Sequence, residues 1–317
     1  MSEPSYRLVD QGARRVLTVD GRDYVTDYSE RIVRMLIERK GARRTPPYFA
    51  YKATRGPRFL GPLFRHLQRR GVTGLRTLEV GSSFGHMTEY LNDQPEVMEL
   101  TAFDTDAAFV AIVRAKAEEL GLEKVRDVAL FPGEATRRLP YQSEQFDLVV
   151  VCGVVEHLPD RARRAQVDEY YRVLARGGHI AILDTPNRWF PLETHSVGLP
   201  LIQWLPPRIA FAYARTFRRR KFGRESYEGF TMEGTGWRNA SLRDCLPSTG
   251  WTGLEDVTED AGYGWQFFRD TARSSTRRAL LPLFAAGVAL ARAGGLPPSV
   301  CLPYLNLLFR KTTVEAR

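Results

Sequence analysis

Short apolar runs alternate with amphipathic segments through the middle of the chain, and this alternation predicts an α/β fold. Unbroken apolar runs are typical of strands buried on both faces of a parallel sheet, whereas apolar residues repeating every three or four positions indicate helices. The order of the patterns is that of a doubly wound, mostly parallel sheet. The predicted strands are residues 75–80, 98–103, 128–131, 146–152 and 179–183, and a helix is predicted over 162–174.

The segments outside this core predict additions at both ends. A hairpin is expected around Asp20-Gly21, and helices over 29–39 and 60–67 either cap a ligand cleft or pack on the sheet edge. A chain of 317 residues can hold one α/β domain with such additions, or two small domains. The expected parts are an N-terminal hairpin and helical cap (1–74), the core (75–260) with an insertion at about 196–240, and an apolar, helical C-terminal extension (261–317).

The most informative segment is a glycine-rich turn between the first predicted strand and the next helical pattern. It reads Glu79-Val80-Gly81-Ser82-Ser83-Phe84-Gly85. Its glycines allow backbone angles that a Cβ disfavours, and the N–H groups that begin the following helix suit an anion or a carboxylate. Asp104 ends the next predicted strand, roughly 20 residues later, where a nucleotide-binding sheet places the acid that accepts ribose hydroxyls. The turn alone fits a cofactor cradle, the dinucleotide fingerprint and the nucleophile elbow of a hydrolase.

The rest of the sequence argues against two of these three chemistries. A hydrolase with Ser83 as nucleophile needs several strands and a glycine cluster for its oxyanion hole before the elbow, and the sequence before residue 75 offers only the hairpin. A dehydrogenase needs a third small residue where His86 stands. A cofactor cradle is therefore the favoured interpretation.

Six blocks of sequence occur in a characteristic order between about residues 75 and 257. They are Leu78-Glu79-Val80-Gly81 with Ser83 and Gly85; Phe103-Asp104; Gly133-Glu134-Ala135 with Leu139-Pro140-Tyr141; Phe146-Asp147-Leu148-Val149; Glu156-His157-Leu158-Pro159-Asp160; and Arg172-Val173-Leu174 with Gly177-Gly178. In these blocks the chain resembles the class I, Rossmann-like S-adenosylmethionine-dependent methyltransferases, particularly the branch of ubiquinone-biosynthesis-type and cell-surface sugar or lipid methyltransferases. That family usually has glycine where this chain has Ser83.

The resemblance implies S-adenosyl-L-methionine as the cofactor. Glu79 and the turn would then hold its methionine end, and Asp104 its ribose. Glu134, with the backbone around Ala135, would lie against the adenine, although Glu134 taken alone fits a solvated loop residue equally well. The implied cofactor-binding residues are Glu79, Gly81, Ser83, Gly85, Asp104, Glu134, Ala135, Cys152 and Gly153, of which the last two would line the methyl-donor pocket.

Two histidines are candidates for activating a methyl acceptor, expected to be a hydroxyl of a small-molecule, lipid-linked or sugar compound, with nitrogen or carbon as the less favoured acceptor atoms. Methyl transfer needs donor and acceptor in line, and a base assists a hydroxyl. His157 follows the fourth predicted strand and His195 the fifth, at the sheet edge where such folds collect site residues. His195, in the variable part expected to build the acceptor pocket, is the preferred base, with Glu193 to orient it. A structural role for either histidine is the alternative.

The net charge of +9 and its distribution point to an anionic partner. Three apolar segments, 198–214, 279–291 and 294–309, each border basic residues. All are shorter than the ~20 residues that a spanning helix needs, and they are typical of segments that lie in the headgroup region of an anionic membrane. The alternative is a helical lid with solvated arginines.

Other classes of partner find less support. Cys152, Cys245 and Cys301 lack metal-ligand spacing, so no metal is expected; without a cleavable signal, we expect a cytoplasmic protein, peripheral at the inner face of the membrane if it binds lipid. The basic run lacks nucleic-acid recognition motifs, which argues against nucleic acid. Besides an active methyltransferase, the sequence leaves open an inactive methyltransferase fold that serves as a binding or scaffold protein.

Overall fold

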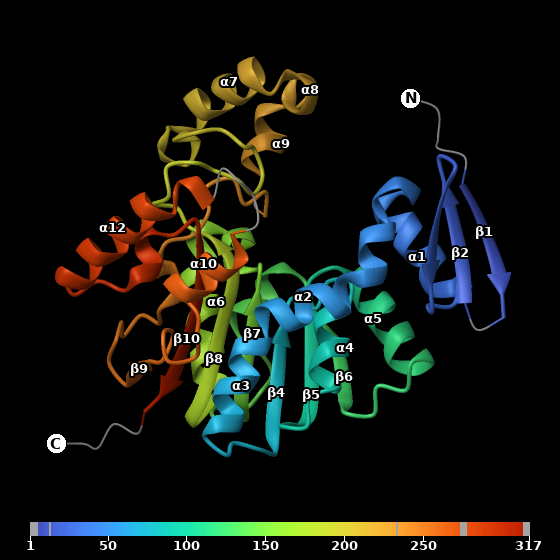
Figure 1. Ribbon diagram of the computed structural model, residues 1–317, viewed down its shortest axis with the longest axis horizontal. Helices are drawn as coiled ribbons and strands as arrows, with labels where there is room; N and C mark the ends of the chain where they lie inside the picture. The colour runs from blue at the N-terminus through green and yellow to red at the C-terminus, as the bar shows by residue number, and fades with distance from the viewer. Residues whose placement is uncertain (1–5, 13, 233, 273–277, 313–317) are drawn as a thin grey trace. The chain divides into compact units, whose positions relative to one another are not determined.

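The computed structural model describes residues 6–12, 14–232, 234–272 and 278–312. The chain divides into two compact units, residues 1–133 and 134–317. The main sheet has seven strands in the order β6-β5-β4-β7-β8-β10-β9, and a separate sheet has the order β1-β2-β3 (Figure 1). The pairs β4–β5, β5–β6 and β7–β8 are parallel, and β10 is antiparallel to its neighbours β8 and β9. The predicted α/β fold with a mostly parallel sheet is confirmed.

The first unit begins with the small antiparallel sheet of β1 (Tyr6–Gln11), β2 (Arg14–Val19) and β3 (Arg22–Thr26). Asp20 and Gly21 join β2 to β3 with φ angles of 50° and 75°, the positive values that a tight primed hairpin turn requires. This is the hairpin that the sequence predicts. β1 was not predicted, because its largely exposed residues carry no clear apolar alternation.

Helix α1 (Glu30–Lys40) confirms the first predicted N-terminal helix. The Ser29 side chain accepts a hydrogen bond from the Ile32 N–H and caps its first turn. Its buried face, which includes Leu36, belongs to one core cluster with Leu17 of the small sheet and Phe84 of the glycine-rich turn. The following elements are the 3₁₀ helices η1 (Ala42–Arg44) and η2 (Pro46–Ala50) and the helices α2 (Tyr51–Phe59) and α3 (Gly61–Arg69), the last of which covers the predicted helix over 60–67.

The first unit also supplies three strands of the main sheet, and the glycine-rich turn lies between the first of them and α4. Val80 pairs with Phe103, so the turn leaves the sheet beside the end of the neighbouring strand. The elements are β4 (Leu75–Val80), α4 (His86–Asn92), β5 (Val97–Asp104), α5 (Ala107–Glu119) and β6 (Val125–Leu130).

The second unit contributes the other four strands. β7 (Phe146–Cys152) has the predicted bounds, and α6 (Asp160–Val173) connects it to β8 (Leu174–Pro186). β10 (Tyr304–Lys311) runs antiparallel between β8 and the short β9 (Leu254–Asp256). The prediction of a membrane-interfacial segment over 294–309 is therefore wrong at its end. Residues 305 and 307–309 are fully buried in β10, because an apolar run also suits a strand covered on both faces.

The insertion between β8 and β9 is helical and has a small core of its own. Ile202, Ala210 and Phe230 are buried there with their neighbours, and α7 packs with α8 and α9. No helix among the described residues combines the length and the apolar character that crossing a bilayer demands. The remaining elements are η3 (Gly133–Arg137), η4 (Val155–His157), η5 (Ile202–Trp204), α7 (Pro207–Phe217), α8 (Arg219–Phe222), α9 (Tyr227–Thr231), η6 (Leu242–Cys245), α10 (Trp265–Thr271), α12 (Leu281–Ala293) and η7 (Pro298–Cys301).

Candidate functional site

The turn after β4 is held open by residues in the left-handed conformation. Gly81, Ser83 and Gly85 have φ angles of 73°, 49° and 75°. The N–H groups of Gly81 and Ser82 both donate to the Phe103 carbonyl, at 2.9 and 3.1 Å. A side chain at Gly85 would press on α5, since its Cβ would lie 3.2 Å from Cγ2 of a valine there. The turn thus has the shape that its glycines predict, and Ser83 adopts it at a strain of about 1–2 kcal/mol.

Asp104 is fixed at the end of β5 by the same turn. Its Oδ2 accepts from the Ser83 N–H at 2.8 Å and its Oδ1 from the Asp106 N–H at 3.0 Å. Burial raises the pKa of Asp104, while these backbone N–H groups lower it, and burial prevails. A carboxylate with two oxygens held at a strand end can accept the hydroxyl pair of a ribose, which is the role predicted for it.

Glu79 lies buried beneath the turn, where its Oε2 accepts a hydrogen bond of 2.6 Å from the Thr88 hydroxyl. Burial raises the pKa of Glu79 to about 8, and the nearby Asp104 charge adds to the shift. A carboxylate so destabilised gains free energy from a cation placed beside it. The ammonium group of a bound methionine moiety would supply that cation, so Glu79 fits its predicted role.

Aromatic side chains of the N-terminal helices pack against the turn. The Tyr48 ring of η2 lies 4.3 Å from that of Phe84, and the Tyr51 ring of α2 lies 5.3 Å from that of His86. Chain segments far apart in the sequence therefore support the turn within the first unit. These contacts come from η2 and α2, whereas the helices predicted to cap a cleft are α1 and α3; their capping role stays a prediction.

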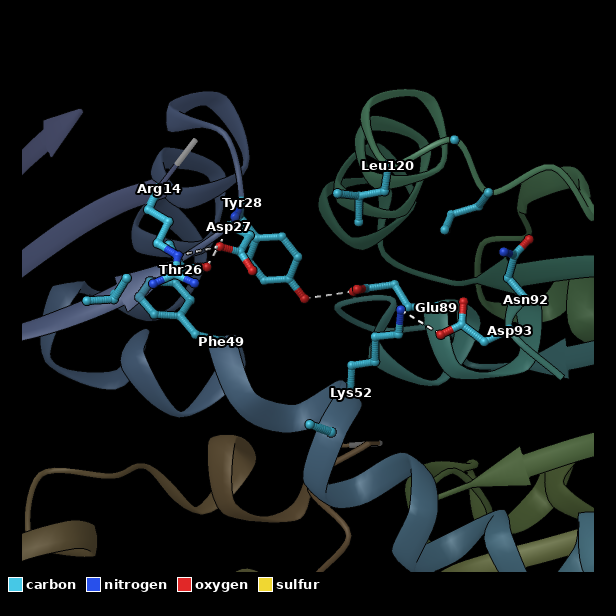
Figure 2. Close-up of a pocket in the computed structure, with 14 residues that line it drawn as sticks. Arg14, Thr26, Asp27, Tyr28, Phe49, Lys52, Glu89, Asn92, Asp93 and Leu120 are labelled. Atoms are coloured by element: carbon cyan, nitrogen blue, oxygen red, sulfur yellow. Dashed lines mark hydrogen bonds and ion pairs between the residues drawn. The ribbon is translucent and has the colours of Figure 1, made fainter. Parts of the chain in front are cut away.

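The first unit contains a cavity of about 680 Å³ that the sequence did not reveal (Figure 2). Tyr28 and Glu89 line it, and their side chains are joined by a 2.8 Å hydrogen bond. Lys116 Nζ lies 2.7 Å from Glu89 Oε1 and 3.0 Å from the Tyr28 hydroxyl. Burial lowers the pKa of Lys116, and Glu89 opposes that shift. The network ties α4, α5 and the start of the chain together, and none of the predicted site residues lines this cavity.

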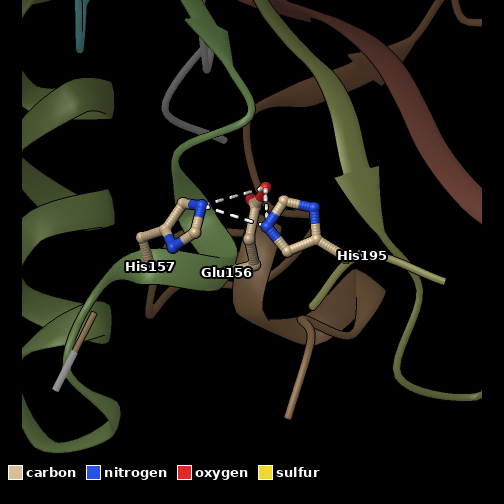
Figure 3. A group of neighbouring side chains, drawn as sticks. All are labelled: Glu156, His157 and His195. Atoms are coloured by element: carbon tan, nitrogen blue, oxygen red, sulfur yellow. Dashed lines mark hydrogen bonds and ion pairs between the residues drawn. The ribbon is translucent and has the colours of Figure 1, made fainter. Parts of the chain in front are cut away.

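In the second unit, the structure brings His157 and His195 together and adds Glu156 (Figure 3). The two Nε2 atoms lie 3.2 Å apart. Glu156 Oε1 lies 3.9 Å from the His157 Nε2 and 4.0 Å from the His195 Nε2. The sequence named both histidines as separate candidates, whereas Glu156 stood only within a family block. Glu156 and His157 are neighbours in the sequence, but nothing in the sequence indicates that His195, 38 positions after His157, lies beside them.

The charge states of this cluster follow from burial. Burial raises the pKa of Glu156 to about 8, lowers that of His157, and lowers that of His195 to about 4. His157 Nδ1 lies 2.7 Å from the Gly234 carbonyl oxygen. Because a carbonyl only accepts, that nitrogen carries the proton, and the Nε2 of the neutral ring presents a lone pair to the cluster.

Glu193 shapes the loop that presents His195. Its buried carboxylate accepts hydrogen bonds of 2.6 to 2.8 Å from four consecutive backbone N–H groups, those of residues 195–198. The sequence predicted that Glu193 orients the histidine. The observed bonds are to the backbone, so Glu193 acts through the loop.

The remaining predicted residues belong to the second unit. Cys152 ends β7, and Gly153 follows with a φ of 65° and an N–H that donates to the Leu183 carbonyl at 2.9 Å. Glu134 and Ala135 lie in η3, and the Glu134 side chain falls outside the described residues. Their contacts with a cofactor remain predictions.

Comparison with known proteins decides the family. Residues 78–182 match the family of methyltransferase domains, and this segment includes the turn, Asp104 and His157. This segment is a class I S-adenosylmethionine-dependent methyltransferase domain. Its cofactor is S-adenosyl-L-methionine, as the sequence blocks implied, and the turn, Asp104 and Glu79 of the domain fit that group.

Two relatives are similar to part of this chain. Phosphatidylethanolamine N-methyltransferase of Cereibacter sphaeroides is 32% identical over 119 residues, which cover 38% of this chain and 53% of the relative. Demethylmenaquinone methyltransferase of Thermus thermophilus is 30% identical over 111 residues, which cover 35% of this chain and 47% of the relative. The chain thus spans about half the length of these relatives. A solved methyltransferase from Aquifex aeolicus is 18% identical, with a TM-score of 0.35, over 50% of this chain and 80% of that one.

Proposed function

We propose that the protein transfers the methyl group of S-adenosyl-L-methionine to an oxygen of a small-molecule, lipid-linked or sugar acceptor. The observation that carries the proposal is the matched methyltransferase domain with its cofactor turn intact and Asp104 held against it. When bound, the cofactor supplies an electrophilic methyl group. The protein's contribution is then to hold the acceptor in line with that group and to exclude competing water.

His195 and His157 are the residues proposed to activate the acceptor hydroxyl. Both follow strands of the main sheet, where α/β folds collect their site residues. Their Nε2 atoms lie 3.2 Å apart, and the neighbouring Glu156 also lines a cavity of about 530 Å³. This volume suits a drug-sized molecule or the head of a larger one. A hydroxyl that enters there can lose its proton as the methyl group is transferred.

A lipid-borne acceptor is the more specific part of the proposal. The names of the two relatives refer to phosphatidylethanolamine and demethylmenaquinone, a phospholipid and a quinone. Large apolar side chains are exposed on the helices of the second unit: Phe217 is 66% exposed at the end of α7, and Leu283 and Leu290 are 70% and 74% exposed on α12. Exposed basic residues 218–221 follow α7 directly. Apolar side chains beside cations suit the headgroup region of an anionic membrane.

The test is a transfer assay with methyl-labelled S-adenosylmethionine. The protein is incubated with separate lipid, quinone and water-soluble extracts, and each labelled product is purified so that NMR can identify the atom that carries the methyl group. Label in a lipid or quinone fraction supports the proposal. Label attached to nitrogen would overturn the proposal that the acceptor atom is oxygen. Label that appears only in water-soluble products would overturn the proposal that the acceptor is lipid-borne.

A further inference from the structure

Three side chains with metal-ligating atoms converge in the second unit, outside the cofactor turn. The ligand atoms of Glu156, His157 and His195 all lie within 4.8 Å of one another. The first two come from η4, which follows β7 directly, and the third comes from the loop after β8 (Figure 3). The sequence predicted no metal because the cysteines lack ligand spacing; this cluster contains no cysteine and forms only in the fold.

Glu156 gives an independent reason to place a cation in this cluster. Its carboxylate is buried, and neither oxygen has a hydrogen-bond partner among the described residues. The nearby Arg163 directs its guanidinium to the Leu158 carbonyl at 3.0 Å and to the Asp160 carboxylate at 3.2 Å. A buried carboxylate without hydrogen bonds is strongly unfavourable unless it is neutralised or binds a metal. The Glu156 carboxylate is therefore available to bind a cation.

The two imidazoles complete a geometry that suits a metal ion. Donation from His157 Nδ1 to the Gly234 carbonyl fixes the ring with its Nε2 lone pair toward the cluster, as outer hydrogen bonds do for histidine ligands. A cation at about 2.1 Å from each Nε2 accounts for their 3.2 Å separation with an N–metal–N angle of about 100°. Gly236 packs on both rings, and a Cβ there would lie 3.0 Å from the His157 ring. The cluster is thus enclosed on one side by backbone.

We propose that Glu156, His157 and His195 bind a divalent transition-metal ion, with Zn²⁺ as the best-matched ion. Two neutral imidazoles and one carboxylate form a donor set that such ions prefer, whereas Mg²⁺ and Ca²⁺ prefer all-oxygen sites. Three protein ligands leave a coordination position open, and Glu156 also lines the adjoining cavity. An acceptor hydroxyl bound at that position loses its proton more readily, and with the ion bound the two histidines act as its ligands and no longer as the base proposed above. This last step rests on the proposed methyl transfer; the binding of the ion does not.

The experiment titrates the full chain, stripped of metal with a chelator, with Zn²⁺ by calorimetry and with Co²⁺ by visible absorption. We expect one ion per chain with a Kd of micromolar or below, and Co²⁺ bands typical of a site with nitrogen and oxygen ligands. Glu156→Gln and His195→Ala should each weaken binding at least tenfold. Glu228→Gln, which alters an exposed carboxylate of the second unit outside this cavity, is the matched control and should bind as the wild type does.

Two results would overturn the inference: no binding of either ion below 100 µM to folded wild-type protein, or equal affinity in the wild type, Glu156→Gln and His195→Ala. Circular dichroism and S-adenosylmethionine binding are measured on the same samples. Cofactor binding without metal binding removes only the cation site. Metal binding without cofactor binding retains the site and removes the proposed methyl transfer.

Discussion

Single buried side chains set the chemistry of the cofactor turn. Glu79 is enclosed beneath the turn, and Ser83 takes a left-handed conformation that L-residues disfavour. Both features have energetic consequences that can be measured in the protein without any ligand. The sequence predicted which residues form the turn, but not these charge and strain effects, since burial and φ angles arise only when the turn meets β5 and α5. The roles assigned to the residues toward the cofactor stay predictions.

Glu79→Gln should make the free energy of unfolding less dependent on pH. The pKa of Glu79 is raised from 4.5 to about 8, so between these values the folded state holds more protons than the unfolded state. Wild-type stability is therefore lost as pH rises through this window, and the variant lacks that loss. Urea unfolding measures the free energy of unfolding of both proteins at pH 5 and pH 8.5. The difference, variant minus wild type, should be about 1–3 kcal/mol more positive at pH 8.5 than at pH 5. A constant difference at both pH values would contradict the assigned shift.

Ser83→Gly should stabilise the protein by up to about 1 kcal/mol. Glycine relieves the strain of a positive φ at this position, and its greater freedom in the unfolded state offsets part of the gain. The backbone N–H that donates to Asp104 is retained. Ser82→Gly is the matched control, and it should destabilise, because Ser82 is buried and is not among the residues with positive φ. Thermal unfolding of the two variants should shift in opposite directions.

At the scale of elements, the sequence correctly predicted the helices and strands whose apolar pattern fits only one kind of secondary structure. The unbroken apolar run of β7 was predicted with its observed bounds, and the helix predicted over 29–39 is α1. The pattern failed at β10, where an apolar run beside prolines and basic residues suits either a membrane-facing segment or a buried strand. Only the pairing with β8 decides between them.

Loop geometry was the other element that the sequence left undetermined. His195 meets His157 because the loop after β8 folds around Glu193, and such long-range contacts leave no periodic signal in the sequence. The candidate residues were thus predictable one by one. Their arrangement as a cluster with Glu156 was not.

Glu193→Gln should loosen the loop that carries His195. An amide offers one acceptor oxygen in place of the two that receive four backbone N–H groups. Losing charge-assisted bonds from buried groups should cost about 2–4 kcal/mol. Hydrogen exchange at residues 195–198 should accelerate, and Glu228→Gln, an exposed change in the same insertion, should leave it unaltered. Unchanged protection in Glu193→Gln would show that other contacts hold the loop.

At the scale of the whole molecule, the positive charge and the exposed apolar side chains of the second unit support the proposal that the protein binds a membrane surface. The net charge is +9, and residues 218–221 form a continuous exposed basic run. Composition predicted a basic surface, and the fold adds Phe217, which is 66% exposed directly before this run. The C-terminal strand β10 removes residues 304–309, the end of the third predicted interfacial segment, from consideration.

If the protein binds a membrane surface as proposed, it should bind vesicles of anionic lipid. The protein should sediment with phosphatidylglycerol vesicles, less so at high salt, and weakly with phosphatidylcholine vesicles. The double variant Arg219→Glu/Arg220→Glu should bind at least tenfold more weakly, because each basic residue near the surface contributes about 1 kcal/mol. Arg7→Glu/Arg22→Glu, with the same change of charge in exposed strands of the first unit, is the control. Equal loss in both variants would indicate attraction by net charge without a defined surface.

The most direct test of the central claim is calorimetric titration of the purified protein with S-adenosylmethionine and S-adenosylhomocysteine, repeated on Asp104→Ala. We predict one binding site of micromolar affinity for both compounds in the wild type and its loss in the variant, whose circular dichroism should remain that of the folded protein. Absence of binding to folded wild-type protein would contradict the account and favour a scaffold role or hydrolysis through Ser83.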